Sequence, residues 1–421
     1  MKINGKRNLV FIPAILVVLW CAGGNILSHA QSPLTSRTNI LSAAEKQNLI
    51  VFDAVWELIN KRYYDSAFNN LDWQKSRKEF RPQAASATDE RKLYATLNLM
   101  LRGLRDKHAY AVAPADVRRE KARKNKHIGD GIGITGRLIE NNFVITEVKP
   151  GSSAESAGIQ TGWILKEWNG APFEFSLFPT GRYSVAPGEK AQLGFLDESD
   201  RFKNVAVVAS QYPFAFRRES KILKDAVLYL RFDEFVSGTT EWFVEQIEKS
   251  RDAEFLIVDL RTNGGGLIRE LEHCLKILFE KEQNIGSMVK RESGGQIWKI
   301  GGSGKNAFRG GIFVLTDKST GSAAEIFASA IQETKRGLIV GRQTAGAVLV
   351  VVREDLPAGG ELSLSIRDYR TANGLRPEGQ GIRPNAEVFL TLNNLRENQD
   401  VDLRKALELI EKITSNSIIN Q

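Results

Sequence analysis

The sequence predicts a chain of several domains, with a helical N-terminal part, a β-rich middle part and a C-terminal part of mixed α/β structure. The chain has 421 residues, which is more than a single hydrophobic core usually organises. Apolar residues recur at helical spacing near the start, and short β-rich runs broken by glycine follow. Later, apolar runs alternate with helical stretches, as in α/β domains. Apolar residues make up 42% and charged residues 26% of the chain, a balance typical of globular proteins.

The N-terminus has the pattern of a secretory signal peptide over residues 1–30. Three basic residues precede an apolar run from Leu9 to Leu19, and small and polar residues lead to Ala30. This order predicts cleavage after Ala30 and export to the periplasm or the cell exterior. The alternative is an uncleaved anchor helix, for which the apolar run is short. After cleavage we expect no stable membrane insertion.

Removal of this leader leaves a chain with one cysteine and little excess charge. The formal net charge falls by three, from +8 to +5, and Cys274 remains as the single thiol. One thiol makes no internal disulfide. The densest basic run, residues 118–126, contains no aromatic residue that could stack on a base. We therefore expect a solvated connector there and no nucleic-acid partner.

Residues 42–120 have the pattern of a small helical domain. Leu93, Leu97, Met100 and Leu104 recur at steps of three and four, which predicts one apolar stripe along a helix. Thr88-Asp89 provides a start signal for that helix, and its end is expected near residues 105–108.

Residues 127–212 contain short β-rich runs separated by glycine. Gly131, Ile132, Gly133 and Ile134 precede a strand-like run at 142–148, a turn, a short helical stretch and the sequence "GWIL". This ordered set resembles the PDZ modules attached to bacterial proteases. The resemblance implies that the backbone N–H groups of residues 131–134 hold a peptide carboxylate, while the peptide adds as a strand to a sheet edge.

Residues 221–412 alternate between buried strands and helices. Strands are expected at 226–230, 255–260, 311–315 and 337–340, and helices at 241–251, 267–279 and 323–333. Alternation of this kind predicts a layered α/β domain with a largely parallel sheet.

Ser322 has the most informative position in this part of the chain. It follows a buried strand and a turn of small residues and stands at the start of a helix. Its hydroxyl would lie near unpaired N–H groups and the positive end of the helix dipole, which suits a nucleophile. Serine is also a favoured helix cap, and this segment alone leaves both roles open.

A second strand ends in the glycine run 264–266, and glycine allows the backbone to approach a ligand closely. The N–H groups of Gly265 and Ala323 could meet at one carbonyl oxygen and form the donor pair that acyl transfer requires. The run lacks the lysine and hydroxyl residue of a phosphate-binding loop.

At these residues the chain resembles the C-terminal processing (tail-specific) serine peptidases and their tricorn-like relatives. The segments "LRDKHAYAVAP", "VDLRTNGGGL", "TDKSTGSAAEIFASAI", "LIVGRQTAGA" and "PEGQGIRPNAEV" occur in the family's order and extend over most of the mature chain. The resemblance implies a ClpP/crotonase-like catalytic domain that cleaves peptide bonds with Ser322.

One departure from this family changes the expected mechanism. The processing peptidases use a lysine as base where this chain has Ala347, and alanine accepts no proton. The tricorn-like branch instead uses histidine and glutamate, which His108 and Glu378 match. Histidine can accept and return a proton near neutral pH. The role of Glu378, either orienting the imidazole or positioning the nucleophile, stays open, and His108 could also simply cap a helix end.

The sequence therefore predicts an exported serine endopeptidase that recruits polypeptides, through free C-termini, by its PDZ-like domain. Ser322, His108 and Glu378 are the expected catalytic residues, with no cofactor and no metal. One alternative is an inactive peptide-binding scaffold of the same fold. Another is a serine-lysine enzyme that uses Lys318 or Lys335 as base.

Overall fold

The structure is a computed structural model that describes residues 41–126, 128–174, 185–224, 226–291 and 293–419. The expected signal peptide and its cleavage site lie outside the described residues. Residues 42–421 form one compact unit. A search of the described residues finds no helix with the length and apolar character needed to cross a membrane.

Three helices open the described chain, and their starts follow capping signals in the sequence. They are α1 (Ala43–Arg62), α2 (Trp73–Ala85) and α3 (Glu90–Arg102). Side chains of Ser42, Asp72 and Asp89 accept the N–H of the third helical residue of their respective helices, which is the usual N-cap arrangement. The apolar stripe expected on α3 is buried, with Leu97 and Leu104 fully inaccessible. Helix α4 (Pro114–Lys126) contains the basic run that was expected in a connector.

The middle of the chain forms a β-sheet with the strand order β3-β4-β5-β7-β8. Its strands are β3 (Ile134–Ile139), β4 (Asn142–Val148), β5 (Ile164–Trp168), β7 (Lys190–Leu196) and β8 (Phe202–Val208), and β6 (Ala171–Pro172) pairs with β5. The short helix α5 (Ser153–Ser156) packs on a core that includes Leu165 and Phe195. A separate pair joins β2 (Ile128–Gly131) to β9 (Ser210–Pro213).

The C-terminal part is built on a six-stranded sheet with the order β10-β11-β12-β15-β16-β19. Its strands are β10 (Arg218–Leu223), β11 (Val227–Phe232), β12 (Phe255–Asp259), β15 (Gly311–Thr316), β16 (Gly337–Gly341) and β19 (Ala386–Glu387). All neighbours are parallel except β10 and β11. The four strands expected from the sequence are therefore confirmed, as is the parallel core.

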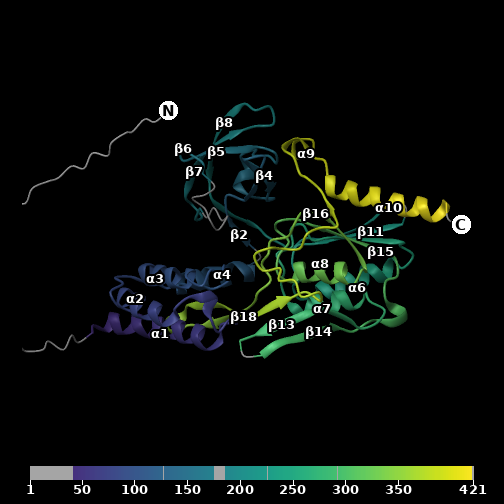
Figure 1. Ribbon diagram of the computed structural model, residues 1–421. Coiled ribbons are helices and arrows are strands. Elements are labelled where there is room, and N and C mark those ends of the chain that lie inside the picture. Colours follow the sequence, from purple (N-terminus) through teal and green to yellow (C-terminus); the bar gives the residue numbers. More distant parts are fainter. Residues whose placement is uncertain (1–40, 127, 175–184, 225, 292, 420–421) are drawn as a thin grey trace, which may run out of the picture. The chain divides into compact units, whose positions relative to one another are not determined.

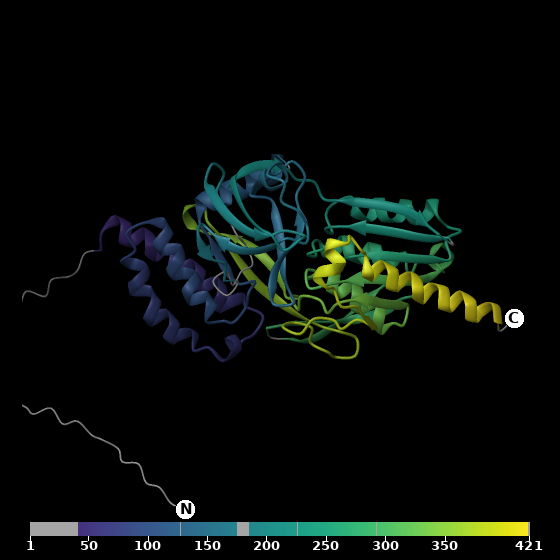
Figure 2. The same cartoon turned by 90° about the horizontal axis from the view of Figure 1, so that it is seen from above.

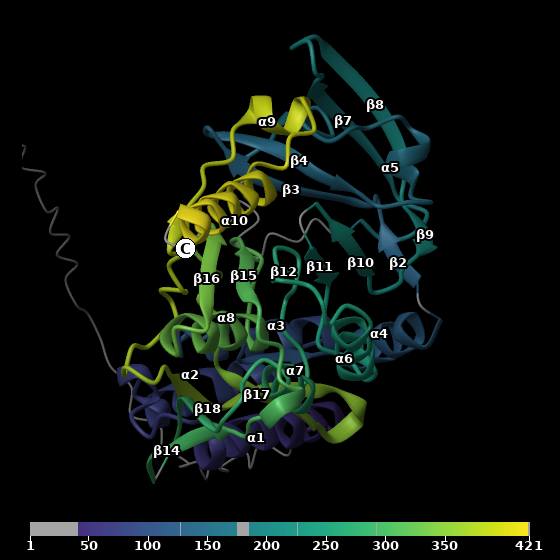
Figure 3. The same ribbon diagram turned by 90° about the vertical axis from the view of Figure 1, so that its right-hand side faces the viewer.

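Helices cover both faces of this sheet (Figures 1 and 3). Alternate residues of each strand face opposite layers, because side chains in a strand alternate with a period of two. Leu256 and Val258 pack with α6 (Thr239–Lys249), α7 (Ile268–Lys276) and α8 (Ala323–Glu333). On the other face, Ile257 and Phe313 pack with α10 (Val401–Ile419), which follows the short α9 (Leu392–Arg396).

A second sheet, absent from the sequence-based expectation, joins the N-terminal helical region to the C-terminal part. It has the order β1-β18-β13-β14, with β17 also paired to β18. Its strands are β1 (Tyr110–Val112), β13 (Gln283–Lys290), β14 (Ser293–Ile300), β17 (Val350–Asp355) and β18 (Glu361–Arg370). Leu362 and Leu364 of β18 are buried among residues of α1 and α3, and Figure 2 shows these helices, in purple and blue, beside the yellow-green strands. The N-terminal helices thus share their core with the C-terminal part.

Candidate active site

Ser322 lies at the end of the turn that joins β15 to α8. Within this turn, the Asp317 N–H donates to Thr320 Oγ1 at 2.9 Å, and that hydroxyl donates to the Leu260 carbonyl at 2.8 Å. The turn is therefore tied to the end of the neighbouring strand β12. Ser322 has φ 52° and ψ −121°, a region that residues with a Cβ rarely adopt. Such strain persists only where surrounding contacts hold it.

The N–H group of Ser322 is held by two acceptors. It donates to the Ala347 carbonyl at 2.8 Å and to Glu325 Oε2 at 3.1 Å. Ala347 is the position at which the family resemblance leads us to expect a lysine base. The backbone of Ala347 therefore contacts Ser322 directly, but the methyl side chain of Ala347 cannot accept a proton.

Gly265 and Ala323, the predicted oxyanion donors, are close neighbours of Ser322. A Cβ added to Gly265, whose φ is +108°, would lie 2.6 Å from Ser322 Cβ and 3.0 Å from Ala323 N. Among the described residues we find no acceptor for the Ala323 N–H. The Gly265 N–H donates to Asn263 Oδ1 at 2.9 Å, so it could reach an oxyanion only by sharing or exchanging that hydrogen bond. The role of Gly265 as a donor stays a prediction.

His108 and Glu378 face each other across a short gap. His108 Nε2 lies 3.9 Å from Glu378 Oε1, and both side chains are mostly buried, at 22% and 15% exposed. Nε2 is inaccessible to solvent and makes no hydrogen bond to a described residue. His108 is held by its backbone, since its N–H donates to Asp106 Oδ1 at 2.8 Å.

Glu378 also connects this histidine to the segment that contacts Ser322. Its Oε2 atom accepts the N–H groups of Val348 at 2.8 Å and Leu349 at 3.2 Å. The segment 347–349 therefore contacts the nucleophile through Ala347 and the glutamate through the next two residues. Glu378 thus lies between His108 and the segment 347–349, which contacts the Ser322 backbone.

Glu325 belongs to this arrangement, although the sequence analysis gave it no role. Its side chain is fully buried and accepts hydrogen bonds from four groups. Burial raises the pKa of this carboxyl, and the hydrogen bonds from Thr344, Ala347, Gly346 and Ser322 oppose that shift. The spacing of Ser322 and Glu325 is that of a capping box, which was the available signal.

The peptide-binding residues predicted at 131–134 lie at the entrance to β3. Gly131 and Gly133 have φ of +108° and +86°, and Ser152 lies so close to Gly133 that a Cβ there would stand 2.2 Å from its Cβ. In its sheet β3 pairs with β4 alone among the described strands. No contact links residues 131–134 directly to Ser322 within the described chain.

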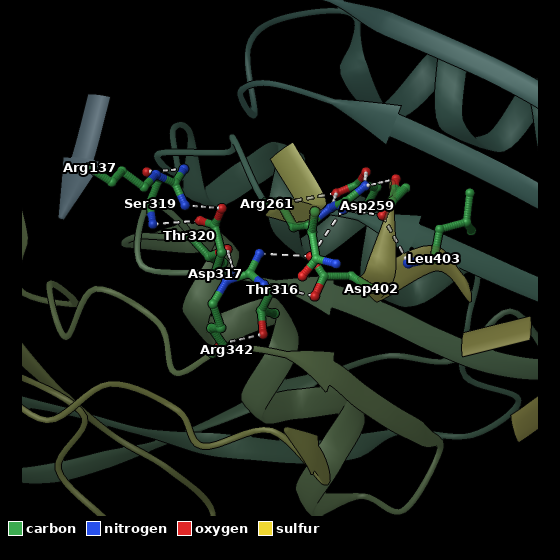
Figure 4. A network of polar contacts seen from close by, with 12 residues as sticks. Arg137, Asp259, Arg261, Thr316, Asp317, Ser319, Thr320, Arg342, Asp402 and Leu403 are labelled. Atoms are coloured by element: carbon green, nitrogen blue, oxygen red, sulfur yellow. Dashed lines mark hydrogen bonds and ion pairs between the residues drawn. The ribbon is translucent and has the colours of Figure 1, made fainter. Parts of the chain in front are cut away.

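A polar cavity of about 610 Å³ lies between the β-rich sheet and the strand ends near the active site. Arg137 of β3 lines it and donates to Asp317 Oδ2 at 2.5 Å and Ser319 Oγ at 2.9 Å, both in the turn before Ser322. Figure 4 shows this contact beside a second group of ion pairs. In that group Arg261 contacts Asp259 at 2.6 Å and Asp402 at 3.1 Å. Gly264 also lines the cavity, so the cavity borders the glycine run 264–266.

Comparison with known proteins shows which peptidases this chain resembles. Residues 226–388 match the model of peptidase family S41, and residues 44–102 match the Tricorn protease C1 domain. The carboxyl-terminal-processing protease of Synechocystis sp. is 24% identical over 403 residues, covering 93% of both chains. The chloroplastic carboxyl-terminal-processing peptidase 1 of Arabidopsis thaliana is 24% identical over 365 residues, covering 82% of this chain and 73% of the relative.

Solved structures share the fold of this chain. The photosystem II D1 C-terminal processing protease has a TM-score of 0.61 at 20% identity, covering 81% of this chain and 93% of that chain. Mature CPAF complexed with lactacystin has a TM-score of 0.65 at 15% identity, covering 90% of this chain and all of that chain. The matched family model and the processing-protease relatives define a serine-type peptidase by class. Within that class, residues 226–388 match peptidase family S41.

Among the described residues, no group of three or more His, Cys, Asp or Glu side chains could hold a metal ion.

Proposed function

We propose that this chain cleaves polypeptides with Ser322 as nucleophile and His108 as general base. The observation that carries the proposal is the shared segment 347–349. Ala347 accepts the N–H of Ser322, while Val348 and Leu349 donate to the glutamate that faces His108. Because one short segment contacts both Ser322 and Glu378, the nucleophile and the partner of the imidazole would be positioned together.

The proposed reaction follows the usual order of serine peptidases. The Ser322 hydroxyl attacks the scissile carbonyl carbon while its proton passes to the His108 imidazole. The C–N bond then breaks, and His108 returns the proton to the leaving amine. A water molecule attacks the resulting ester by the same proton transfers and releases the acid and free Ser322. Glu378 would stabilise the imidazolium that forms in each half of the reaction.

The oxyanion formed in each addition step would be bound by backbone N–H groups. The Ala323 N–H is unpaired among the described groups and lies at the N-terminus of α8, whose dipole favours negative charge. Gly265 is the second proposed donor. Its contact with Asn263 implies that substrate binding is accompanied by a change in this hydrogen bond.

We further propose that the β-rich domain recruits substrates as a PDZ-like module. Among the described strands of that sheet, β3 pairs on one side only, and its other edge suits addition of a peptide strand. The left-handed glycines before β3 could present N–H groups to a terminal carboxylate. The names of the relatives, which refer to carboxyl-terminal processing, favour a free C-terminus as the recognised feature.

Export of the mature enzyme is also a proposal, based on the leader-like sequence at residues 1–30. N-terminal sequencing of the protein recovered from its producing cells would test it. A mature N-terminus at residue 31 outside the cytoplasm is the expected result. Intact Met1 in the cytoplasmic fraction would contradict it.

The serine-lysine alternative finds little support in the structure. Lys335 is exposed and lies beyond the C-terminal end of α8, whereas Ser322 caps its N-terminus. An eleven-residue helix spans about 16 Å, which is too far for direct proton transfer. Lys318 is also exposed.

The function is tested by comparing wild type with S322A and H108A. We expect wild type to digest an unfolded polypeptide and to react at Ser322 with an activated phosphonate. S322A should show neither reaction, and H108A should lose at least about 10²-fold in rate, the size of a general-base contribution. Full activity of H108A would exclude histidine as the base. Peptide binding without turnover in wild type would establish the inactive scaffold instead.

A further inference from the structure

We propose that Glu325 is a positioning residue of the peptidase reaction, which holds the strained nucleophile and the loop that carries Glu378 in one fixed arrangement. This inference rests on the proposed function of Ser322, His108 and Glu378.

The carboxylate of Glu325 is completely enclosed and each of its oxygens accepts two hydrogen bonds. Oε1 accepts from Thr344 Oγ1 at 2.5 Å and from the Gly346 N–H at 2.7 Å. Oε2 accepts from the Ala347 N–H at 2.8 Å and from the Ser322 N–H at 3.1 Å. The side chain has no exposed surface. It therefore binds residues 344–347 to the N-terminus of α8.

These contacts determine the orientation of the nucleophile. Ser322 has a backbone conformation that is unfavourable for serine, so its neighbours must hold its peptide group in place. Its N–H points at Glu325 Oε2 and at the Ala347 carbonyl, and the Ala347 position is itself fixed by Glu325. Loss of the carboxylate would release both restraints together.

The same carboxylate reaches Glu378 through the loop it binds. The Thr344 hydroxyl that donates to Glu325 accepts the Ile382 N–H at 2.6 Å, and the Gly346 carbonyl accepts the Gly379 N–H at 2.8 Å. Glu378 directly precedes Gly379 and faces His108. Glu325 thus links the two segments that carry the nucleophile and the partner of the base.

An amide cannot replace this carboxylate without loss. Four donors converge on two oxygens, and glutamine offers only one oxygen and adds an N–H₂ group. In E325Q at least two donors would face that group with no acceptor in a buried site. The segments that carry Ser322 and Glu378 should then no longer be held in a fixed arrangement, although glutamine has nearly the same size as glutamate.

Glu270 provides a matched control. It is also a buried glutamate in the third position of a helix, 3% exposed at the start of α7. It accepts the Thr240 N–H at 2.9 Å and the Thr240 hydroxyl at 2.8 Å, and no described contact joins it to Ser322, Glu378 or His108. E270Q therefore makes the same chemical change away from the active site.

The experiment compares full-length wild type, E325Q and E270Q by the rate of Ser322 labelling with an activated phosphonate. The same proteins are assayed for kcat and KM on an unfolded polypeptide and for thermal stability. We expect E325Q to lose about 10² to 10³-fold in labelling rate and kcat, as when a transition-state contact is misplaced, with KM changed by less than about threefold. E270Q should keep kcat within about threefold of wild type, even if its thermal stability falls as much as that of E325Q.

Equal labelling of E325Q and wild type would overturn the inference, as would losses in both variants that follow stability alone. If E325Q does not fold, T344V removes the hydroxyl that links Glu325 to Ile382, and an unchanged kcat in T344V would likewise overturn it. A wild-type protein without labelling would instead refute the proposed function, and with it the role assigned to Glu325.

Discussion

The backbone of Ser322 combines φ 52° with ψ −121°, which is suited to glycine and not to a residue with a side chain. Two hydrogen bonds to its N–H keep it there. The cost of such a conformation is of the order of 1–3 kcal/mol. At this position the need for an accessible hydroxyl opposes the backbone preference of serine.

This conflict predicts that S322G is more stable than S322A. Both variants remove the nucleophile, but only glycine adopts this conformation without strain. We expect S322G to be more stable by about 1 kcal/mol in chemical denaturation, somewhat offset by its greater unfolded-state freedom. A lower stability of S322G would show that position 322 is unstrained in solution.

The glycine run provides a second residue-scale prediction. Alanine at Gly265 would place Cβ 2.6 Å from Ser322 Cβ at a φ of +108°, whereas a Cβ on Gly264 meets no atom within 4 Å. G265A should therefore lose nearly all phosphonate labelling, and G264A should keep most of it. Similar labelling of the two variants would mean that the close approach of Gly265 is unimportant for the reaction.

At the scale of elements, the three-residue strand β1 fixes the region that carries His108. It pairs antiparallel with β18, with Tyr110 opposite Ser363. The Asn98 side chain of α3 holds it from the other side, donating to the Ala111 carbonyl at 2.9 Å and accepting the Ala111 N–H at 2.8 Å. His108 lies two residues before β1, so its placement depends on this pairing.

We expect N98A to reduce kcat through displacement of His108. Loss of two hydrogen bonds should destabilise the protein by about 1–3 kcal/mol. The matched control is N48A, since Asn48 of α1 also bonds two backbone carbonyls in the helical region, those of Ala85 and Ala87. Steady-state kinetics should show a larger fall in kcat for N98A than for N48A at similar stability. Equal kcat values would argue against a role for β1 in positioning the base.

At the scale of the whole molecule, an ion-pair network fixes α10 to the ends of the central strands. Arg261 contacts Asp259, Asp400 and Asp402, and Arg342 contacts Asp402 at 2.7 Å. Burial alone would raise the pKa of Asp259 and of Asp400, but Arg261 outweighs it, so that both pKa values lie below the ordinary range. The C-terminal helix is thus attached by charge as well as by apolar packing.

These depressed pKa values predict that stability falls in acid. Above about pH 4, the usual pKa of an aspartate, both carboxylates are ionised in folded and unfolded chains, and their stabilisation is complete. As the pH falls further, the unfolded chain takes up protons first, and the stabilisation is lost as the pH passes through the folded pKa values. D259N should cost about 3–5 kcal/mol near neutral pH, because it leaves Arg261 buried with fewer partners.

Urea unfolding between pH 2 and pH 7 provides the measurement. D259N should show a smaller change in stability with pH than wild type does. The same pH dependence in both proteins would show that Asp259 has an ordinary pKa in the folded state.

The pattern along the chain was enough to predict four parallel strands of the six-stranded sheet and the helices α6, α7 and α8 between them. These four strands are apolar runs of five or six residues that alternate with helical stretches, so the local pattern identified both. It also indicated Ser322, because a strand, a small-residue turn and a helix follow one another in the chain. The family resemblance added His108 and Glu378, whose catalytic roles remain predictions.

The contacts that join these residues depend on the tertiary structure and could not be predicted from the sequence. The sheet of β1, β13, β14, β17 and β18 pairs segments more than 250 residues apart, such as Tyr110 with Ser363, and local patterns contain no signal for such pairing. Glu325 could not be recognised for a similar reason. A glutamate three residues into a helix looks like an ordinary cap, and only the fold brings Thr344, Gly346 and Ala347 to its carboxylate. Hydrogen bonds between distant segments depend on packing in three dimensions, whereas periodicity is written along the chain.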